Sequence, residues 1–283
     1  MPGGLALITL SGGNNLARTA EQVWCCRERP TRLGGMTSQR IPATGLRLSA
    51  PMDQVRAAKL EATQRLLGST MGISEDQWQS PSLLPGWTRA HVATHLARGA
   101  EALTGIVLAI VEGRTVPPMY PSPEQRDTDI ERGSERTGLE LQIDLDTTAE
   151  RLHESFDGLV GELTDVPVTL APDITVRACQ LPAVRLAEVL LHHVDLDAGF
   201  DLSQSPALAA RCLLEWVAYR LRDRVGIPAL HIVSESGFSD RIGGTGFATT
   251  VRGSDAALAG WLSGRADGST LEGTDNLALP LLA

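Results

Sequence analysis

The sequence predicts an α+β protein: a four-helix bundle over residues 52–200 and a smaller α+β domain over 201–283. Three observations lead to this prediction. Long segments before Gly199 carry apolar residues three or four positions apart, the period of helices that bury one face. After Gly199, short β-like runs alternate with helical ones. Apolar residues make up 42% of the 283-residue chain and charged residues 21%, which is enough apolar surface for a packed core.

Residues 1–51 differ in composition from the rest of the chain. They hold six Arg and only two acidic residues, are rich in Gly, Pro, Ser and Thr, and show no sustained apolar period. We expect them to be a disordered extension or the product of a misassigned start, and we assign no function to them.

Two long helices and a shorter one are predicted in the first half of the bundle. Met52 opens the first, because good helix formers with regularly spaced leucines follow it. Thr88 is a suitable N-cap for the second, whose apolar stripe continues to about Gly113. After a Pro-rich loop, Ser122 caps a further helix that begins with Pro and Glu.

The remaining bundle helices follow from capping signals. Thr147 and Glu150 form a capping-box pattern that predicts the start of a third long helix. Pro182 is expected to begin a fourth long helix that runs to Gly199, a natural left-handed cap. Between these two helices, residues 165–181 read as a β-like excursion or a long loop. Four long helices with crossover loops predict a bundle.

The second domain is predicted from four segments. Residues 208–221 form an amphipathic helix, and residues 254–262 form another. Residues 230–233 and 248–251 read as two strands of a hairpin, with Gly243-Gly244 in the turn between them.

Charge and hydropathy exclude several classes of partner. The net charge is −9 with His neutral, whereas a nucleic-acid backbone needs a basic surface. No wholly apolar run approaches the roughly 20 residues that span a bilayer, and no signal-peptide pattern precedes the first apolar run. We therefore expect no nucleic-acid or membrane partner and a cytoplasmic location, and a monomer is compatible with the sequence.

The candidate chemistry lies in histidines on two predicted helices. Residues four apart on a helix share one face, so Glu188 and His192 can approach one ion, and His91 or His95 of the second helix can complete the set. Two imidazoles and one carboxylate around an open position are typical of catalytic zinc. The alternative is a polar helix face with a buried histidine bonded to the backbone. A site is favoured because a carboxylate such as Glu188 inside a bundle needs a cation to offset its desolvation.

Two segments carry a family resemblance. Residues 84–97 (LPGWTRAHVATHLA) and 185–196 (RLAEVLLHHVDL) resemble the two signatures of the mycothiol-dependent maleylpyruvate isomerase family, within the DinB-like bundle superfamily. The loop 119–126, Gly133-Ser134 and the stretch 253–268 are also similar to the isomerase. Together these matches span roughly Met52 to the C-terminus.

The resemblance implies a metal-ligand set. It places zinc on His95, Glu188 and His192, and it makes His91 and His193 neighbours rather than ligands. Spacing alone leaves the choice between His91 and His95 open.

The resemblance also implies roles for two arginines. Arg265 matches a family arginine implicated in catalysis, and Arg126 matches one suited to an anionic substrate or the thiol cofactor. For both, the alternative is a salt bridge at the surface. The C-terminal domain resembles a sterol-carrier-like fold, which in this family is expected to complete the cleft rather than bind lipid.

The implied activity is the mycothiol-dependent isomerisation of maleylpyruvate to fumarylpyruvate in gentisate-type aromatic degradation. Addition of a zinc-bound thiolate to the cis double bond, rotation about the resulting single bond and elimination would accomplish it, because zinc keeps the thiol deprotonated. The expected cofactors are zinc and mycothiol, and the expected partners are a small-molecule substrate and a low-molecular-weight thiol. The alternatives are a mycothiol S-transferase that acts on electrophiles, and a non-catalytic metal-binding bundle with a regulatory role.

Overall fold

The structure is a computed structural model that describes residues 45–222, 224, 226–274, 277 and 279–282. All of these belong to one compact unit, residues 37–283. Most of the segment expected to be an extension or a misassigned start lies outside the described residues, so that expectation stays a prediction.

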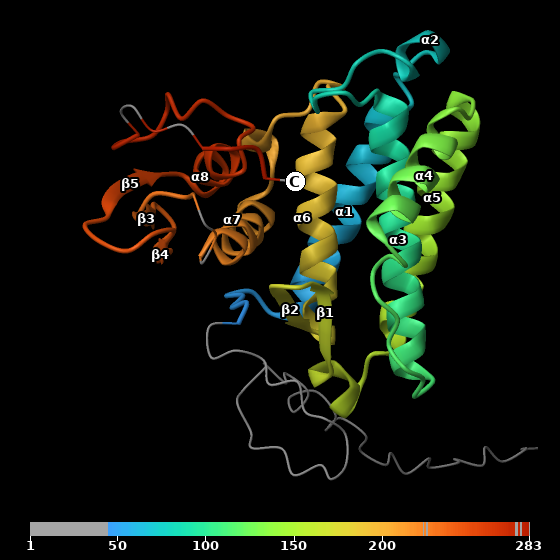
Figure 1. Ribbon diagram of the computed structural model, residues 1–283, viewed down its shortest axis with the longest axis horizontal. Helices are drawn as coiled ribbons and strands as arrows, with labels where there is room; N and C mark the ends of the chain where they lie inside the picture. Colours follow the sequence, from blue (N-terminus) through green and yellow to red (C-terminus); the bar gives the residue numbers. More distant parts are fainter. Residues whose placement is uncertain (1–44, 223, 225, 275–276, 278, 283) are drawn as a thin grey trace, which may run out of the picture. The chain divides into compact units, whose positions relative to one another are not determined.

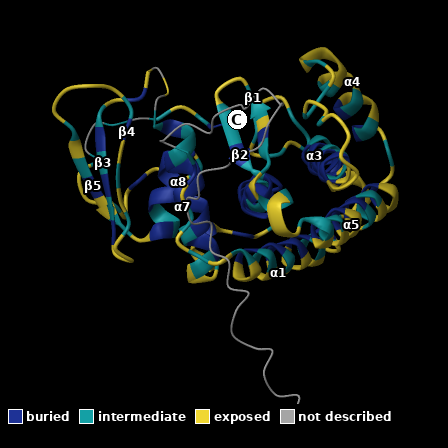
Figure 2. Ribbon diagram, turned by 90° about the horizontal axis from the view of Figure 1, so that it is seen from below, coloured by how far each residue is buried: buried dark blue, intermediate teal, exposed yellow. Residues whose placement is uncertain are grey.

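Four long helices form the predicted bundle (Figure 1). The closest packing is between α3 and α5 and between α1 and α6, and the inward faces of these helices are buried (Figure 2). Two shorter helices accompany them, and the second of these packs against α3. The six helices are α1 (Met52–Thr70), α2 (Glu75–Trp78), α3 (Arg89–Val111), α4 (Pro123–Ser134), α5 (Gly138–Ser155) and α6 (Leu181–Asp195).

Helix α3 begins where the sequence predicts. The Thr88 side chain accepts a hydrogen bond from the backbone N–H of His91, which satisfies one of the free donors of the first turn. By length and composition α3 could cross a membrane, but 61% of its most apolar window is buried inside the structure. The same apolar character is therefore explained by its place in the bundle core.

The predicted start of the third long helix is wrong. Helix α5 begins one residue after Thr137, which forms a capping box with Glu140, and Thr147 and Glu150 lie inside the helix. The reason is packing: the buried face of α5 already begins at Leu141, so contact with the bundle favours the earlier of the two capping patterns.

The β-like excursion is confirmed as a hairpin of β1 (Pro167–Ala171) and β2 (Ile174–Arg177), which pair antiparallel. Helix α6 follows with Pro182 in its first turn, as predicted, but it ends at Asp195 rather than at Gly199. The chain leaves the helix through Asp197 and Gly199, which both have positive φ (51° and 84°).

The C-terminal part has two helices and a three-stranded sheet of order β4-β3-β5. The predicted hairpin between residues 230–233 and 248–251 is wrong, because those strands are parallel neighbours. The antiparallel partner of β3 is β4, which the sequence pattern missed because its residues Ser-Asp-Arg-Ile lack apolar alternation. The elements are α7 (Ala207–Leu221), β3 (Leu230–Ser234), β4 (Ser239–Ile242), β5 (Thr249–Gly253) and α8 (Asp255–Leu262).

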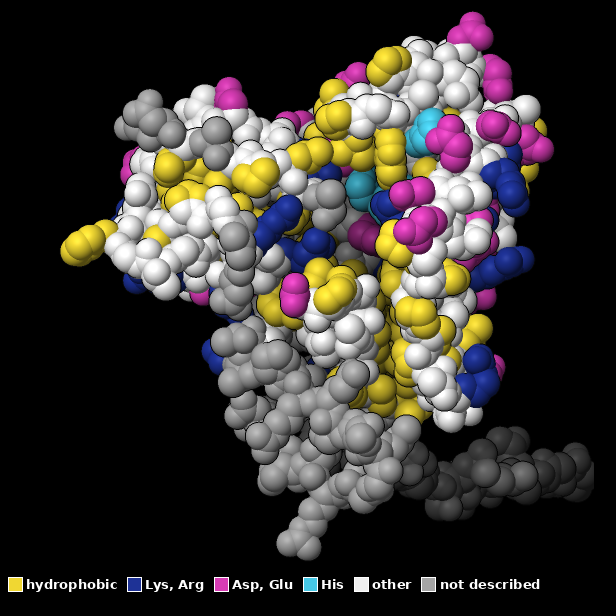
Figure 3. Space-filling view, in the orientation of Figure 1, with side chains coloured by type: hydrophobic (Ala, Val, Ile, Leu, Met, Phe, Trp, Pro, Cys, Tyr) yellow, Lys and Arg dark blue, Asp and Glu magenta, His cyan; other side chains and the backbone are white. Residues whose placement is uncertain are grey.

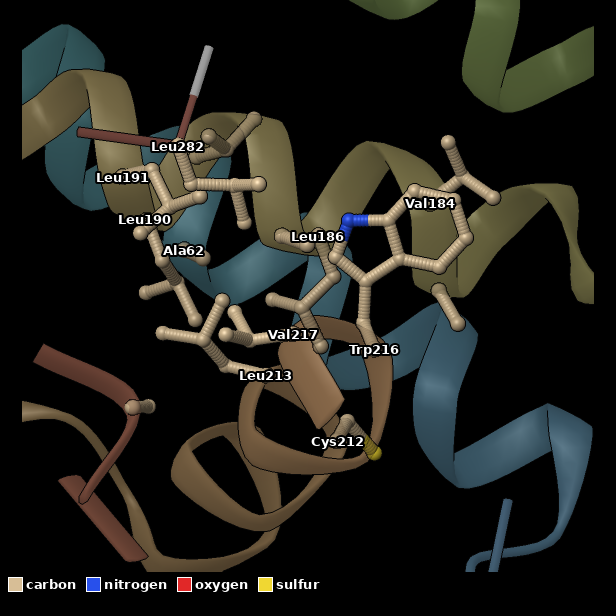
Figure 4. Packing of buried hydrophobic residues seen from close by; sticks show 14 of the residues in the cluster. Ala62, Val184, Leu186, Leu190, Leu191, Cys212, Leu213, Trp216, Val217 and Leu282 are labelled. Atoms are coloured by element: carbon tan, nitrogen blue, oxygen red, sulfur yellow. The ribbon is translucent and has the colours of Figure 1, made fainter. Parts of the chain in front are cut away.

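The C-terminal part packs on the bundle through α7. Leu213, Trp216 and Val217 of α7 meet Leu186 and Leu190 of α6 in one buried apolar cluster (Figure 4). Burying side chains of this size stabilises the fold by roughly 1.5–3 kcal/mol each. Residues that follow α8 are thereby held where they can reach α6. The division into domains 52–200 and 201–283 stays a prediction.

The short segment before α1 is also bound to this interface. The side-chain amide of buried Gln180 donates to the carbonyl of Leu46 (2.8 Å). The backbone N–H of Ser49 donates to the carboxylate of Glu215 on α7 (3.1 and 3.2 Å). The segment 45–51 therefore satisfies polar groups at the junction of α6 and α7.

Candidate metal and anion site

One face of α6 carries a row of polar side chains, which we call the α6 polar row: Arg185, Glu188, His192 and Asp195. Their spacing of three, four and three residues places them one above another along the helix. Figure 3 shows histidine, acidic and basic side chains gathered in a hollow of the molecule, with apolar side chains around it.

Arg185 and Glu188 form the first contact of the row. The Arg185 side chain is 3% exposed, and its Nη1 donates to the carbonyl of Leu96 (2.9 Å) and to Glu188 Oε2 (3.3 Å). Burial lowers the pKa of Arg185, whereas the Glu188 charge raises it. Gly99 of α3 lies close to this pair, since a Cβ at that position would make ordinary contacts with Arg185 Nη1 (3.5 Å) and Glu188 Oε2 (3.6 Å).

His95 of α3 faces the same row. Its ring centre lies 4.7 Å from that of His192 and 5.6 Å from that of Trp87. Its Nδ1 is buried and has no hydrogen-bond partner in the described part of the chain. Burial lowers the pKa of His95 well below its ordinary value, and the charges of His192 and Arg126 add to this. A neutral imidazole with an unpartnered nitrogen is suited to bind a metal.

His192, Asp195 and Arg265 form a second group at the C-terminal end of the row. His192 Nδ1 lies 2.9 Å from Asp195 Oδ2, and the Arg265 guanidinium contacts both carboxylate oxygens, through Nε at 3.1 Å and Nη2 at 2.7 Å. Burial raises the pKa of Asp195, but hydrogen bonds from His192 and Arg265 outweigh it, so the pKa is below its ordinary value.

The other two histidines near the site, His91 and His193, have contacts of their own. His91 has partners on both nitrogens: Nδ1 contacts Thr88 Oγ1 (2.7 Å) and Nε2 contacts Glu131 Oε2 (3.1 Å). His193 stacks on Phe200 with ring centres 4.0 Å apart, and its Nε2 contacts Ser69 Oγ (2.8 Å). These contacts give His91 and His193 structural roles in this conformation.

The donor set matches zinc in kind, although the described residues contain no ready-made group of three ligands. His95 and His192 lie together and offer imidazoles, and His95 holds the unpartnered buried nitrogen. Glu188 is directed to Arg185, so it would exchange that partner for a metal. Two imidazoles and a carboxylate are a donor set that zinc accepts. Zinc itself stays a prediction.

Arg126 of α4 lies beside this group. Its guanidinium carbon is 5.7 Å from the ring centre of Trp87 and 5.8 Å from that of Tyr120, and Nη1 pairs with Asp127 (2.8 Å). The Tyr120 hydroxyl is buried, and the Arg126 guanidinium acts on it to lower its pKa. Burial and the nearby Glu188 charge raise the pKa of Tyr120 to about 12, so the hydroxyl is a donor at neutral pH.

Arg265 is placed differently from the expectation of a substrate contact or a surface salt bridge. Its side chain is 3% exposed, and Nη1 donates to the carbonyls of Ser263 (2.9 Å) and Leu282 (2.8 Å) in addition to the pair with Asp195. A direct contact between Arg265 and a substrate stays a prediction.

Three residues of the site have no role in the sequence-based predictions: Arg185, Asp195 and Tyr120. Helical spacing offers a signal for two of them, since Arg185 precedes Glu188 by three residues and Asp195 follows His192 by three. Tyr120 lies in a loop, where spacing carries no such signal.

Comparisons with known proteins bear on the domain and on the fold. Residues 60–197 match the family described as mycothiol maleylpyruvate isomerase N-terminal domain. Two solved structures of the mycothiol-dependent maleylpyruvate isomerase, one of them a histidine-to-alanine mutant, are similar to this chain. Each has a TM-score of 0.73 and 23% sequence identity, and each alignment covers 83% of this chain and 97% of the other. A search among curated proteins found no significant match. The predicted α+β fold is thereby confirmed, including the part that follows the bundle.

Proposed function

We propose that this chain isomerises maleylpyruvate to fumarylpyruvate with mycothiol as cofactor, on the premise that residues 60–197 match the family described as mycothiol maleylpyruvate isomerase N-terminal domain. The observation that carries the proposal is the meeting of His95 with the α6 polar row. There, an unpartnered neutral imidazole, a second imidazole and a carboxylate lie within reach of buried or half-buried guanidinium groups.

The reaction requires the cis double bond to lose its double-bond character for a short time. Zinc, when bound, would keep the thiol of mycothiol deprotonated, so that the thiol can add reversibly to that bond. The carbon–sulfur bond that forms turns the alkene into a single bond that can rotate, and the electron pair moves to the conjugated carbonyl oxygen. When the same carbon–sulfur bond breaks, the electron pair returns and the trans alkene is released, so the thiol is regenerated.

The chain's own residues supply the ligands and the charge for this chemistry. His95, Glu188 and His192 are the groups that would hold the metal. Arg126 is the group we assign to a substrate carboxylate or the thiol cofactor, because its side chain is 31% exposed and its guanidinium lies within 6 Å of the Trp87 and Tyr120 ring centres. Tyr120 remains protonated at neutral pH, and the guanidinium of Arg126 can only donate to it, so its hydroxyl proton is available for the oxygen that gains negative charge.

The cationic character of the site favours an anionic substrate. The charges of Arg126 and Arg185 both act on His95, and Arg185 is fully inside the protein. Because Arg185 pairs with Glu188 and Arg126 with the exposed Asp127, a bound divalent metal would leave the site positively charged, and a dicarboxylate substrate would compensate this charge.

The test is an ultraviolet time course of maleylpyruvate with the full chain, run with mycothiol, without mycothiol, and after chelation followed by return of zinc. Turnover that needs both the thiol and the metal, and that returns with zinc, is the expected result. Turnover that is unaffected by removing the thiol would contradict the proposal.

A thiol transferase is distinguished in the same experiment. If the chain binds zinc but leaves maleylpyruvate unchanged, mycothiol and a set of electrophiles such as chlorodinitrobenzene would be assayed for adduct formation. A stable adduct would identify an enzyme that stops after addition, and the isomerase proposal would then be wrong.

A further inference from the structure

We propose that Asp195, held by Arg265 from the C-terminal part, is a positioning residue that fixes the ring and the tautomer of His192, and that Arg265 acts through Asp195. The inference rests on the proposed function only in taking His192 as a metal ligand. It assigns the His192–Asp195–Arg265 group a role in preparing the site before any metal or substrate arrives.

The contacts of Asp195 are complete and directional. Oδ2 contacts both His192 Nδ1 (2.9 Å) and Arg265 Nη2 (2.7 Å), and Oδ1 accepts from Arg265 Nε (3.1 Å). The side chain of Asp195 is 1% exposed, so water does not compete for these oxygens. A carboxylate in this position accepts hydrogen bonds and donates none.

This arrangement determines which nitrogen of His192 carries the proton. Because the carboxylate is only an acceptor, Nδ1 must be the protonated nitrogen, and the lone pair of the neutral ring is then on Nε2. Histidines that bind metals commonly use one nitrogen for the metal and donate the other to a carboxylate, which orients the ring and makes it a better ligand. His192 already has this arrangement without a metal.

Arg265 in turn fixes Asp195. The guanidinium binds the carboxylate in a two-point fork, and its third nitrogen donates to the carbonyls of Ser263 (2.9 Å) and Leu282 (2.8 Å). The backbone N–H of Leu282 donates back to the carbonyl of Ser263 (3.1 Å), which closes the local network. The C-terminal part therefore contributes to the bundle site through one arginine whose side chain is 3% exposed.

The first experiment replaces the acceptor by Asp195→Asn in the full chain. We expect zinc affinity, measured by competition with a chromogenic chelator, to fall about 10- to 100-fold, the usual cost of removing an outer partner of a metal-binding histidine. In the zinc-free protein, ¹⁵N spectra of the histidine side chains should show His192 losing its single Nδ1–H tautomer. This spectroscopic readout does not depend on activity.

Glu215→Gln is the matched control. Glu215 is also a buried carboxylate bonded to an arginine, Arg211 Nε at 2.8 Å, but it touches no histidine. The control should lose stability while its zinc affinity and the His192 spectrum stay at the wild-type values. A loss of zinc affinity in both variants would show that Asp195 matters only for folding, and the proposal would be overturned.

Arg265 is tested separately, which also covers the case in which Asp195→Asn does not fold. Arg265→Met should weaken zinc binding and broaden the His192 signals, and Arg265→Lys, which keeps the charge but not the fork, should recover part of both. If Arg265 instead contacts the substrate directly, Arg265→Met would raise KM and leave zinc affinity and the His192 tautomer unchanged.

The outcomes separate this inference from the proposed function. If the protein does not isomerise maleylpyruvate but Asp195→Asn shows the expected tautomer and zinc effects, the positioning role is supported and the proposed reaction is wrong. If the Asp195→Asn variant isomerises maleylpyruvate normally and keeps wild-type zinc affinity, the proposed reaction is supported and the positioning role is overturned.

Discussion

The two ends of the α6 polar row differ in how well their polar groups are satisfied. At the C-terminal end, both oxygens of Asp195 are hydrogen-bonded and the carboxylate is almost fully buried. Towards Glu188, by contrast, the carboxylate is 22% exposed, and His95 Nδ1, whose ring faces His192, has no hydrogen-bond partner in the described residues. Buried polar groups without partners are costly, so folding alone would not favour them. The satisfied end is a scaffold, and the unsatisfied end is where a ligand is expected.

The balance of charge differs in the same way. Asp195 and Arg265 neutralise each other at the C-terminal end of the row. Towards the N-terminal end, Arg185 pairs with Glu188, and the buried Lys59 of α1 adds a further positive charge. The interior of the bundle is therefore the region in which an added anion would be stabilised.

Replacing His95 should have the largest effect on metal binding and activity, because it removes the buried nitrogen without a partner. His95→Ala deletes the unpartnered nitrogen, and we expect zinc content near zero and isomerisation reduced by more than the roughly 100-fold typical of losing an outer partner. Metal content is measured by atomic emission after dialysis, and activity by the ultraviolet assay.

His91→Ala is the control for this prediction. It should keep zinc, because both nitrogens of His91 already have protein partners, and lose only part of the α3 cap, worth on the order of 1 kcal/mol. Full zinc in His95→Ala and none in His91→Ala would transfer the ligand role to His91.

Replacing Lys59 tests the buried positive charge through the free energy of unfolding. Lys59 is 1% exposed, and its Nζ lies 3.2 Å from His153 Nδ1. Burial, with the charges of Arg185 and Arg56, lowers its pKa from 10.5 to about 8. Between about pH 8 and pH 10.5, Lys59 is protonated in the unfolded chain and deprotonated in the native chain. The contribution of Lys59 to the free energy of unfolding therefore rises with pH, by up to about 3 kcal/mol across that range.

Lys59→Met removes this dependence and should be more stable than wild type at pH 7. Urea denaturation of both proteins at several pH values from 7 to 10 gives the difference in the free energy of unfolding. The stability advantage of the variant should narrow steadily above pH 8. A difference that is constant with pH would mean that native Lys59 titrates as it does in the unfolded chain.

Arg126→Met tests whether the unsatisfied end binds an anion. Loss of a hydrogen bond to a charged group costs about 1.5–3 kcal/mol, so kcat/KM should fall roughly 10- to 100-fold, mainly through KM. Arg132→Met is the matched control, because Arg132 is an exposed arginine of the same helix. Equal effects of the two changes on KM would indicate a general charge effect instead of a binding contact.

Gly133→Ala is expected to have the smallest effect on activity. A methyl group at Gly133 would overlap Thr94 Cγ2 of α3, so α4 must move away, at a cost of about 1–3 kcal/mol. Because α4 also carries Arg126, KM should rise modestly. Gly105→Ala, where a methyl group meets no atom within 4 Å, should instead be neutral or slightly stabilising. Thermal denaturation and KM of both variants make the test.

Local signals predicted most of the bundle. Thr88 caps α3, Ser122 caps α4 and Pro182 lies in the first turn of α6, and in each case one short pattern was sufficient. The start of α5 was missed because two capping patterns lie ten residues apart, and only packing against the bundle distinguishes them. Strand β4 was missed because pairing with β3 defines it, not its own composition.

In the site, too, local patterns predict some residues, and contacts between distant residues define others. Helical spacing marks Glu188 and His192 as candidate ligands but leaves His91 and His95 open, and only the family resemblance selects His95. The contact between Arg265 and Asp195 joins residues 70 apart in sequence, and no local pattern encodes it. The family resemblance indicates a catalytic role for Arg265, whereas the structure shows that its partner is Asp195.

The segment before α1 has a practical consequence for anyone preparing this protein. A shortened version that begins at Met52 would remove the carbonyl bound by Gln180 and the N–H bound by Glu215. Each buried group left without its partner costs about 1–3 kcal/mol. Such a version should melt several degrees lower than the full chain in differential scanning calorimetry. Poor yield or weak activity from it would then reflect the choice of first residue and say nothing about the chemistry of the site.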